Sequence, residues 1–311
     1  FKNKAELIDI AFKKGFEKLN SKILLERDYK KLKKTNLRTI KNLVSHYQMT
    51  NNSELSKNNV LINLFFKRDK MYNFYSLNNI KYSDVRGKSI KILPVLLLNN
   101  EIFIYENNFF YENWLSNNKK EKIENKNIEY SLPLENLEVI EKIKKNQNNL
   151  EELILDDIFD ENLEKDNLLI IIDFKEKRSN IFLKGNISSK LIVKNLVVVD
   201  DSVKKFNYQN IMLFLKKEIL EIVKSQNVID IRTPSFLKIK LNFEKKNDLY
   251  LFQNILYEIE LIESFNIREF NNKYAYIRVK YFGKTNIIKE KLLQKGLDLK
   301  LDDNEIIAKV R

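Results

Sequence analysis

The chain has 311 residues, 43% of them hydrophobic, and a formal net charge of +13. This length and hydrophobic content suffice for two or three packed domains and exclude general disorder. It has no cysteine, one histidine (His46) and five isolated glycines, which excludes thiol chemistry, disulfides, multi-histidine metal sites and glycine-rich phosphate loops. The longest apolar runs fall far short of the ~20 residues that span a bilayer, so we predict no transmembrane segment, no metal and no cofactor.

The first 84 residues predict a small basic α+β module. Apolar residues at helical spacing predict a helix over residues 4–25, and the period changes to two in a predicted strand over residues 59–66, with residues 48–54 as its hairpin partner. A short helix near 69–77 and a strand at 80–82 complete the module, which we interpret as a ferredoxin-like unit without its first strand. Between the first helix and the hairpin we predict a second helix with one apolar face: Leu37, Ile40, Val44 and Tyr47.

Residues 85–228 predict a central α/β domain. Uninterrupted apolar strands separated by helices are typical of a sheet that is covered on both faces. The expected order is strands 90–98 and 101–105, helix 109–115, strand 128–132, a helical region over 137–158, strands 168–174, 180–183 and 191–199, and helix 204–224.

Residues 229–311 predict the βαββαβ order of a ferredoxin-like module. The fold class is therefore mixed α+β, with the central domain between ferredoxin-like modules at 1–84 and 229–311. The expected elements of the last module are strand 236–243, helix 248–264, strands 265–270 and 274–282, helix 285–294, and strands around 297–301 and 305–310.

The positive charge is concentrated in the first module. Residues 1–84 carry 18 basic and 8 acidic side chains, whereas residues 85–228 carry 22 and 23. A candidate surface for an anionic partner is the basic run between the first two helices, with a solvated loop as the alternative. Its residues are Arg27, Lys30, Lys31, Lys33, Lys34 and Arg38.

Three polar features are candidates for catalytic or metal sites. His46 is flanked by predicted helical core positions and has no nucleophile at a useful spacing, so we interpret it as a packed or surface residue. Asp200 and Asp201 follow a strand directly, where α/β enzymes place catalytic carboxylates, but they are also ordinary helix caps, which we prefer. A solvated helix end is expected for one acidic cluster, which lacks the glycine of a calcium loop: Asp156, Asp157, Asp160 and Glu161.

One aromatic cluster offers either a binding face or core packing. Its helical spacing favours the core. The cluster comprises Phe109, Phe110, Tyr111 and Trp114.

Three segments in the middle of the chain form a recognisable pattern: residues 80–95, which end in Leu93-Pro-Val95, residues 104–114, which end at Trp114, and Leu132-Pro-Leu-Glu-Asn-Leu137. The pattern resembles that of an alphaproteobacterial family numbered 2066 among the domains of unknown function. Tyr105 and Phe109 depart from the pattern, because tryptophans are usual there. Shorter similarities flank these segments at Ala11–Phe16, Leu43–Tyr47, Tyr281–Lys284 and Leu297–Lys300.

What the resemblance implies is a location rather than an activity. The family resembles exported proteins with a signal peptide and has no assigned catalytic residues, and a chain that starts at Phe1 fits either a cleaved leader or a trimmed sequence. We therefore expect a periplasmic or secreted protein, with the cytoplasm as the alternative.

Three functional hypotheses follow. The first is a non-enzymatic binding or assembly protein whose basic first module faces an anionic envelope component or an acidic protein. The second is a cytoplasmic protein that binds nucleic acid on its ferredoxin-like sheet. It is disfavoured because only 9 of the 56 basic residues are arginine, and burial of Tyr274, Tyr276 and Phe282 under helices would argue against it further. The third is a hydrolase that uses Asp200 and Asp201.

Overall fold

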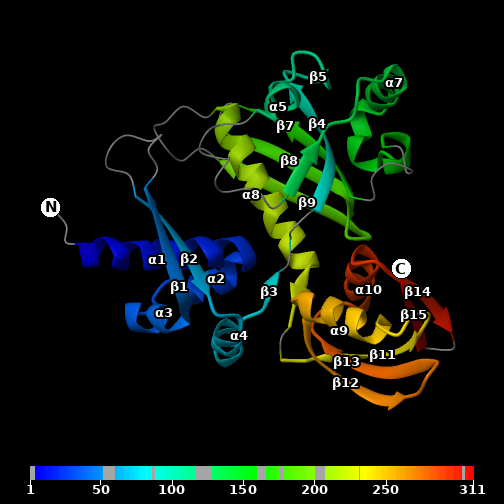
Figure 1. The fold of residues 1–311 in the computed structure, drawn as a ribbon. Helices are drawn as coiled ribbons and strands as arrows, with labels where there is room; N and C mark the ends of the chain where they lie inside the picture. Colours follow the sequence, from blue (N-terminus) through cyan, green and yellow to red (C-terminus); the bar gives the residue numbers. More distant parts are fainter. Residues whose placement is uncertain are drawn as a thin grey trace. The chain divides into compact units, whose positions relative to one another are not determined.

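The computed structural model of the chain contains helices and several sheets, so the predicted α+β class is confirmed (Figure 1). The chain forms two compact units. Unit 1 combines Phe1–Ser83 with Val228–Arg311, and unit 2 is Asp84–Asn227. The first and third predicted modules therefore belong to one unit. The structure describes residues 4–51, 60–83, 85, 88–116, 128–159, 166–175, 178–199, 207–230, 232–302 and 305–311.

The N-terminal part of unit 1 is an antiparallel hairpin packed against a long helix. The helix is α1 (Lys4–Ile23), and Gly15 lets it approach the hairpin closely, because a Cβ at this position would overlap the side chain of Leu64. The ring centroid of Phe16 lies 6.3 Å from that of Phe66. The remaining elements are α2 (Glu26–Leu32), α3 (Leu37–Leu43), β1 (Val44–Asn51), β2 (Val60–Phe66) and α4 (Arg68–Leu77).

The second helix is shorter than predicted. It ends at Leu43, and Val44–Tyr47 already belong to β1, where Val44 stands opposite Phe66 and Tyr47 opposite Leu64. Apolar spacing alone fits either structure here, and strand pairing decides between them because valine and tyrosine also favour strands. The predicted hairpin is confirmed.

The next strand does not join that hairpin. β3 (Tyr82–Ser83) pairs antiparallel with β10 (Val228–Ile229), and β1 and β2 form a two-stranded sheet. This differs from a ferredoxin-like unit, in which the last strand would extend the sheet of the hairpin.

The C-terminal part of unit 1 is a five-stranded sheet, whose first six elements follow the predicted βαββαβ order and are followed by a fifth strand. The strand order is β12-β13-β11-β15-β14. A ferredoxin-like sheet would place its fourth strand beside its first, whereas here β15 lies between β11 and β14 and runs parallel to β11. The elements are β11 (Ser235–Asn242), α9 (Asp248–Glu258), β12 (Ile262–Phe270), β13 (Tyr274–Tyr281), α10 (Thr285–Gln294), β14 (Leu297–Asp302) and β15 (Glu305–Val310).

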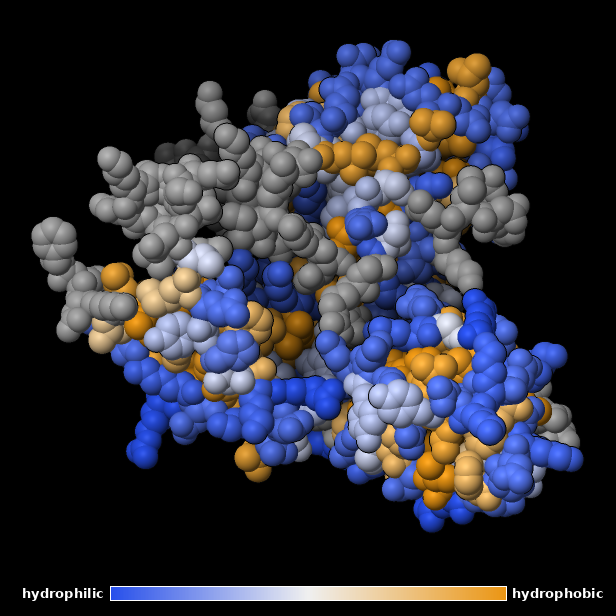
Figure 2. All heavy atoms as spheres, viewed as in Figure 1, coloured by the Kyte–Doolittle hydropathy of each residue, from blue (hydrophilic) through white to orange (hydrophobic). Residues whose placement is uncertain are grey.

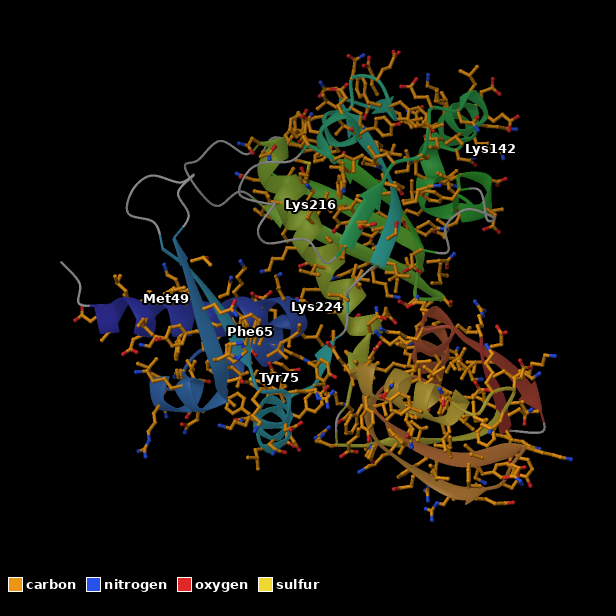
Figure 3. The ribbon with its side chains drawn as sticks, viewed as in Figure 1. Met49, Phe65, Tyr75, Lys142, Lys216 and Lys224 are labelled. Atoms are coloured by element: carbon orange, nitrogen blue, oxygen red, sulfur yellow. The ribbon has the colours of Figure 1, made fainter. Side chains whose placement is uncertain are left out.

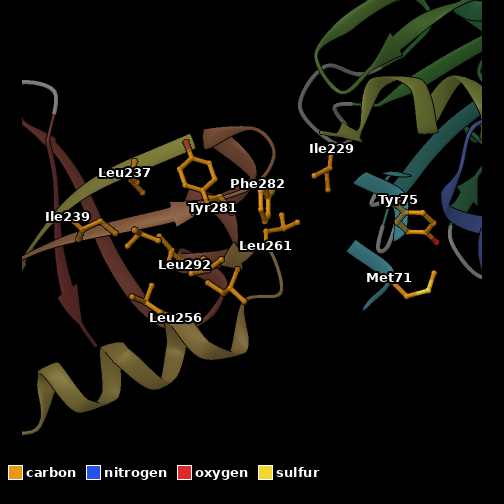
Figure 4. Packing of buried hydrophobic residues seen from close by; sticks show 14 of the residues in the cluster. Met71, Tyr75, Ile229, Leu237, Ile239, Leu256, Leu261, Tyr281, Phe282 and Leu292 are labelled. Atoms are coloured by element: carbon orange, nitrogen blue, oxygen red, sulfur yellow. The ribbon is translucent and has the colours of Figure 1, made fainter. Parts of the chain in front are cut away.

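Both helices of this part pack on the same face of the sheet. Leu256 of α9 and Leu292 of α10 meet the buried strand residues Leu237 and Ile239 (Figure 4). Within the described residues, no helix of this C-terminal part packs on the opposite face of the sheet.

Unit 2 is a mixed six-stranded sheet with helical segments on both faces, as predicted. β4 is parallel to β6 and β7, whereas the β4–β5, β7–β8 and β8–β9 pairs are antiparallel. Two separate apolar clusters fill the two sides of this sheet. The elements are β4 (Lys88–Leu98), β5 (Glu101–Phe103), α5 (Phe109–Asn113), β6 (Ile128–Ser131), α7 (Leu137–Lys145), η1 (Gln147–Glu152), η2 (Leu155–Asp157), β7 (Asn167–Asp173), β8 (Arg178–Ile187), β9 (Lys190–Val199) and α8 (Tyr208–Gln226).

Hydrophilic side chains cover much of the surface in view, with hydrophobic side chains gathered in a few places (Figure 2). Among the described helices, none has the length and apolarity to cross a membrane.

Candidate functional site

The predicted basic run is partly neutralised by its own helix. Lys30 lies 3.3 Å from Glu26, one turn earlier in α2, and Lys31 lies 2.6 Å from Asp28. Arg27 lies 3.8 Å from the same Asp28 carboxylate. Three of the six cations thus share two carboxylates, which offset two of the six positive charges.

The other three cations of the run differ in their surroundings. The ammonium of Lys33 lies 5.5 Å from the ring centroid of Tyr29. Lys34 and Arg38 are exposed and form no ion pair with a carboxylate in the described part of the chain. The run therefore keeps an excess of positive charge, which is exposed and screened at physiological salt.

His46 lies on a strand rather than on a helix, which corrects the prediction. It is exposed on β1, and its ring stacks on Phe65 of β2 with centroids 4.4 Å apart and an interplanar angle of 7°. Phe65 and Met49 lie on this hairpin (Figure 3). The imidazole is therefore a surface stacking partner, which fits the structural interpretation.

The acidic candidates give no site in the described residues. Asp157 pairs with Lys142 of α7 at 2.8 Å. Asp160, Glu161, Asp200 and Asp201 lie outside the described residues. Within the described ranges, no group of three or more histidine, aspartate or glutamate side chains is arranged to hold a metal ion.

The aromatic cluster of α5 belongs to the core, as its spacing predicts. Phe110 and Trp114 are fully buried, and the Tyr111 hydroxyl donates to the carbonyl of Pro133 at 2.7 Å. Lys216 of α8 lies 5.9 Å from the Trp114 ring centroid (Figure 3).

Unit 2 has one open groove of about 580 Å³ among the described pockets. Its polar lining includes Asn149, Glu152 and Asn180, together with Asp173 at the end of β7. The Asp173 carboxylate is paired with Lys175 at 2.9 Å. This groove lacks a convergent set of reactive groups.

The helix-free face of the five-stranded sheet gathers cations and aromatic rings. Along β11 and β13, buried apolar residues alternate with partly or fully exposed polar and aromatic ones, because successive strand residues point to opposite faces. We call this surface the open sheet face. Its central members are Phe236, Lys238 and Lys240 on β11 and Tyr274, Tyr276, Arg278 and Lys280 on β13.

Two cations stand directly opposite each other at the middle of this face. Lys238 of β11 pairs in register with Arg278 of β13, and neither forms an ion pair with a described carboxylate. On the other side of Arg278, β12 presents the neutral Asn266. Like charges at directly opposed strand positions destabilise a sheet, so this pair costs the fold stability.

The aromatic rings of the open sheet face lie under cations. The Lys240 ammonium is 4.8 Å from the Tyr274 ring centroid and 5.5 Å from that of Tyr276. The Arg278 guanidinium is 4.0 Å from the ring centroid of Phe236, which is 50% exposed. Cations and rings therefore alternate over adjacent strands.

Carboxylates also occur on this face. Lys280 pairs with Glu263 of β12 at 2.7 Å, and the Tyr274 hydroxyl donates to Glu269 at 3.2 Å. Glu305 of β15 neighbours Lys238 in the parallel register with β11, but the two form no ion pair. The three cations Lys238, Lys240 and Arg278 outnumber this carboxylate at the centre of the face.

The sequence holds a signal for this face that composition does not reveal. The alternation Phe236-x-Lys238-x-Lys240 places one aromatic ring and two cations on the same side of a strand. Of the three rings expected to decide the nucleic-acid hypothesis, Tyr274 and Tyr276 lie half-buried on the open sheet face and only Phe282 is buried, at 6% exposure.

Comparisons of the chain with family models, with curated proteins and with solved structures gave no match, and the resemblance described above stays a prediction.

Proposed function

We propose that this chain is a non-enzymatic binding protein and that its open sheet face holds an extended anionic ligand. The observation that carries this proposal is the like-charge pair of Lys238 and Arg278, which stands at the centre of the face and forms no ion pair with a described carboxylate. The arrangement raises the free energy of the unliganded fold and becomes favourable when an anion bridges the two cations.

The ligand is expected to be a chain rather than a single small anion. Lys240, Lys238 and Arg278 lie on adjacent positions of two neighbouring strands, so their charges form a patch rather than one enclosed pocket. A linear polymer with repeated negative charges meets several of these cations at once. Exposed cations of this kind bind in a strongly salt-dependent way.

Single-stranded nucleic acid is the candidate ligand that the aromatic rings favour. Proteins that bind single strands combine a positive surface with rings on which bases stack, and sheet-based readers use the open face of a four-stranded sheet. Phe236 on the first strand and Tyr274 and Tyr276 on the third strand of the module provide such rings. An acidic protein or polymer uses the cations but has no need of the rings.

The test compares binding of a fluorescent single-stranded oligonucleotide with binding of polyglutamate, for the wild-type chain and two double variants. K238Q/R278Q removes one lysine and one arginine from the open sheet face, and K34Q/R38Q removes the same charges from the predicted basic run. We expect K238Q/R278Q to weaken binding and to reduce the slope of log K against log salt by about 0.7 for each phosphate that the variant no longer neutralises. K34Q/R38Q should bind like the wild type.

The outcomes separate the two ligand classes. If Y274A/Y276A weakens oligonucleotide binding but not polyglutamate binding, the ligand is a nucleic acid. Equal effects on both probes indicate a simple polyanion site. Failure of the wild-type chain to bind either probe at low salt, or loss of binding only in K34Q/R38Q, contradicts the proposal.

The periplasmic or secreted location rests on the family resemblance alone and belongs to the same proposal. It bears on the ligand, because an exported location favours an acidic polymer or protein and a cytoplasmic location favours single-stranded nucleic acid. Cell fractionation of the full reading frame decides it, and a purely cytoplasmic signal contradicts the export prediction.

A further inference from the structure

The last strand of the unit 2 sheet is an apolar edge strand. β9 pairs with β8 on one side, and no described strand pairs with its other side (Figure 1). Its Ile192, Leu196 and Val198 pack toward α8, but every second residue points to the opposite face and is exposed. The exposed hydrophobic residues are Leu191 (62%), Val193 (56%), Val197 (48%) and Val199 (55%).

β9 lacks most of the features that protect edge strands from pairing with another chain. The β8–β9 ladder runs without a bulge from Arg178↔Val199 to Ile187↔Lys190, and β9 contains no proline. One protective feature is present, because Lys194 in the middle of the strand is a charge that points inward to the α8 side, but this charge is paired with Glu218 at 2.7 Å. A long, regular edge strand of this kind offers a row of unpaired main-chain groups to a second strand.

We propose that β9 is the contact between two copies of this chain, which pair their β9 strands antiparallel across a twofold axis. The surface is separate from the open sheet face, so this inference does not rest on the proposed function. Its basis is that the sequence of β9 is complementary to itself, as an isologous interface requires.

The complementarity is centred on Asn195. Pairing about this residue places Asn195 opposite Asn195 of the second copy, Val193 opposite Val197, and Leu191 opposite Val199. The one polar residue of the exposed stripe then meets its own copy, and amide side chains can donate to and accept from each other. All other positions of the stripe pair apolar side chains, which favours sheet pairing.

Other registers are worse. A twofold axis perpendicular to the sheet keeps each side chain on its own face, so directly opposed residues differ by an even number of positions. Centring on Lys194 sets two like charges directly opposite each other. Centring on Val193 or Leu196 shortens the overlap and places Asn195 opposite an apolar residue.

The test is a charge swap at the axis, followed by sedimentation velocity over a range of concentrations. Asn195 is exposed, so N195K and N195D leave the fold intact, which the thermal melting curve checks. Each variant alone places like charges opposite each other, and we expect the dimer dissociation constant to rise on the order of tenfold or more. An equimolar mixture of N195K and N195D restores the dimer as a heterodimer.

The matched control is Asn180, which is also exposed and lies on the same face of the neighbouring strand, beside Val197. N180K and N180D change the same charges one strand away from the axis, so they should leave the dimer almost unchanged. The proposal is overturned if the wild-type chain stays monomeric up to about millimolar concentration. It is equally overturned if the N195K and N195D mixture fails to associate, or if the Asn180 variants dissociate the dimer as strongly.

Discussion

Removing one of the two opposed cations on the open sheet face should stabilise the protein while it weakens ligand binding. The change is K238Q, which keeps most of the aliphatic side chain at an exposed strand position and removes its charge. Arg278 is the poorer choice, because its guanidinium also lies over the Phe236 ring and its replacement would remove that interaction. The two readouts of K238Q are thus expected to move in opposite directions.

The size of the gain follows from the register. Directly opposed side chains have Cβ atoms ~5 Å apart, which leaves the charged ends of Lys238 and Arg278 roughly 7 Å apart. With effective dielectric constants of about 20 to 80, the repulsion is ~0.6–2.4 kcal/mol, and a Debye length of ~10 Å at 0.1 M salt roughly halves it. We therefore expect K238Q to raise the free energy of unfolding by at most ~1 kcal/mol at low salt, because loss of the attraction between Lys238 and the neighbouring Glu305 offsets part of the gain.

Urea denaturation at low and high salt measures this gain. It should shrink as salt is added, because screening already weakens the repulsion in the wild type. The control is K309Q on β15 of the same sheet, where Lys309 is paired with Glu244 at 2.8 Å, so loss of the charge should give no gain. A K238Q protein that is less stable than the wild type at low salt, or equally stable at all salt concentrations, refutes the repulsion on which the proposed function rests.

Two further predictions concern stability. Hydrogen bonds from Arg232 and Lys81 hold the pKa of the Asp230 carboxyl well below its usual range, against an opposing effect of burial. D230N should therefore be less stable than the wild type in urea denaturation at pH 7. This difference in stability should shrink as the pH falls below about 4, because a depressed pKa contributes stability only while the carboxylate stays charged. An unchanged deficit at pH 3 would contradict this assignment. At Gly185 of β8, an added Cβ would overlap the backbone carbonyl of Asn167 in the neighbouring strand, so G185A should cost at least ~1–3 kcal/mol in the same assay, and a neutral result would show that the ladder can shift.

Local patterns in the sequence predict most element types and many of their bounds. The apolar spacing predicts the last helix over residues 285–294, and the structure has it at Thr285–Gln294, followed by a left-handed Gly296 that ends it. Predictions fail where the apolar spacing continues past a helix end. The helix predicted to residue 264 ends at Glu258, because Ile262–Ser264 pair with β13 and no glycine or proline marks the change.

Contacts between residues that are far apart in the sequence cannot be predicted from local sequence patterns. The insertion of β15 between β11 and β14 depends on which strands meet in space. Asn108 is another case, since its buried side-chain amide donates to the carbonyls of Pro94, Phe103 and Ile104. Its place directly before the predicted helix 109–115 marks it as an N-cap, which it is, but its burial and its hydrogen bonds to three carbonyls are not visible in the sequence.

Part of the candidate site can be predicted from the sequence. The alternation along β11 predicts which side chains share a face, and Tyr274 and Tyr276 stand among the rings that the sequence offers for stacking. The opposition of Lys238 and Arg278 is not predictable, because it depends on the exact register between strands that are separated by a helix and a third strand.

The pairing of β3 with β10 has a consequence for how this polypeptide is built. The chain leaves unit 1 after Ser83 and returns to it at Val228, and these two residues stand opposite each other in one antiparallel pair. Residues 84–227 are thus an insertion into a hairpin whose two stems already meet. A two-residue turn that joins Ser83 to Val228 should therefore yield a shortened protein in which unit 1 folds without its insert, and the excised segment, which has its own two apolar clusters, should fold as a separate protein.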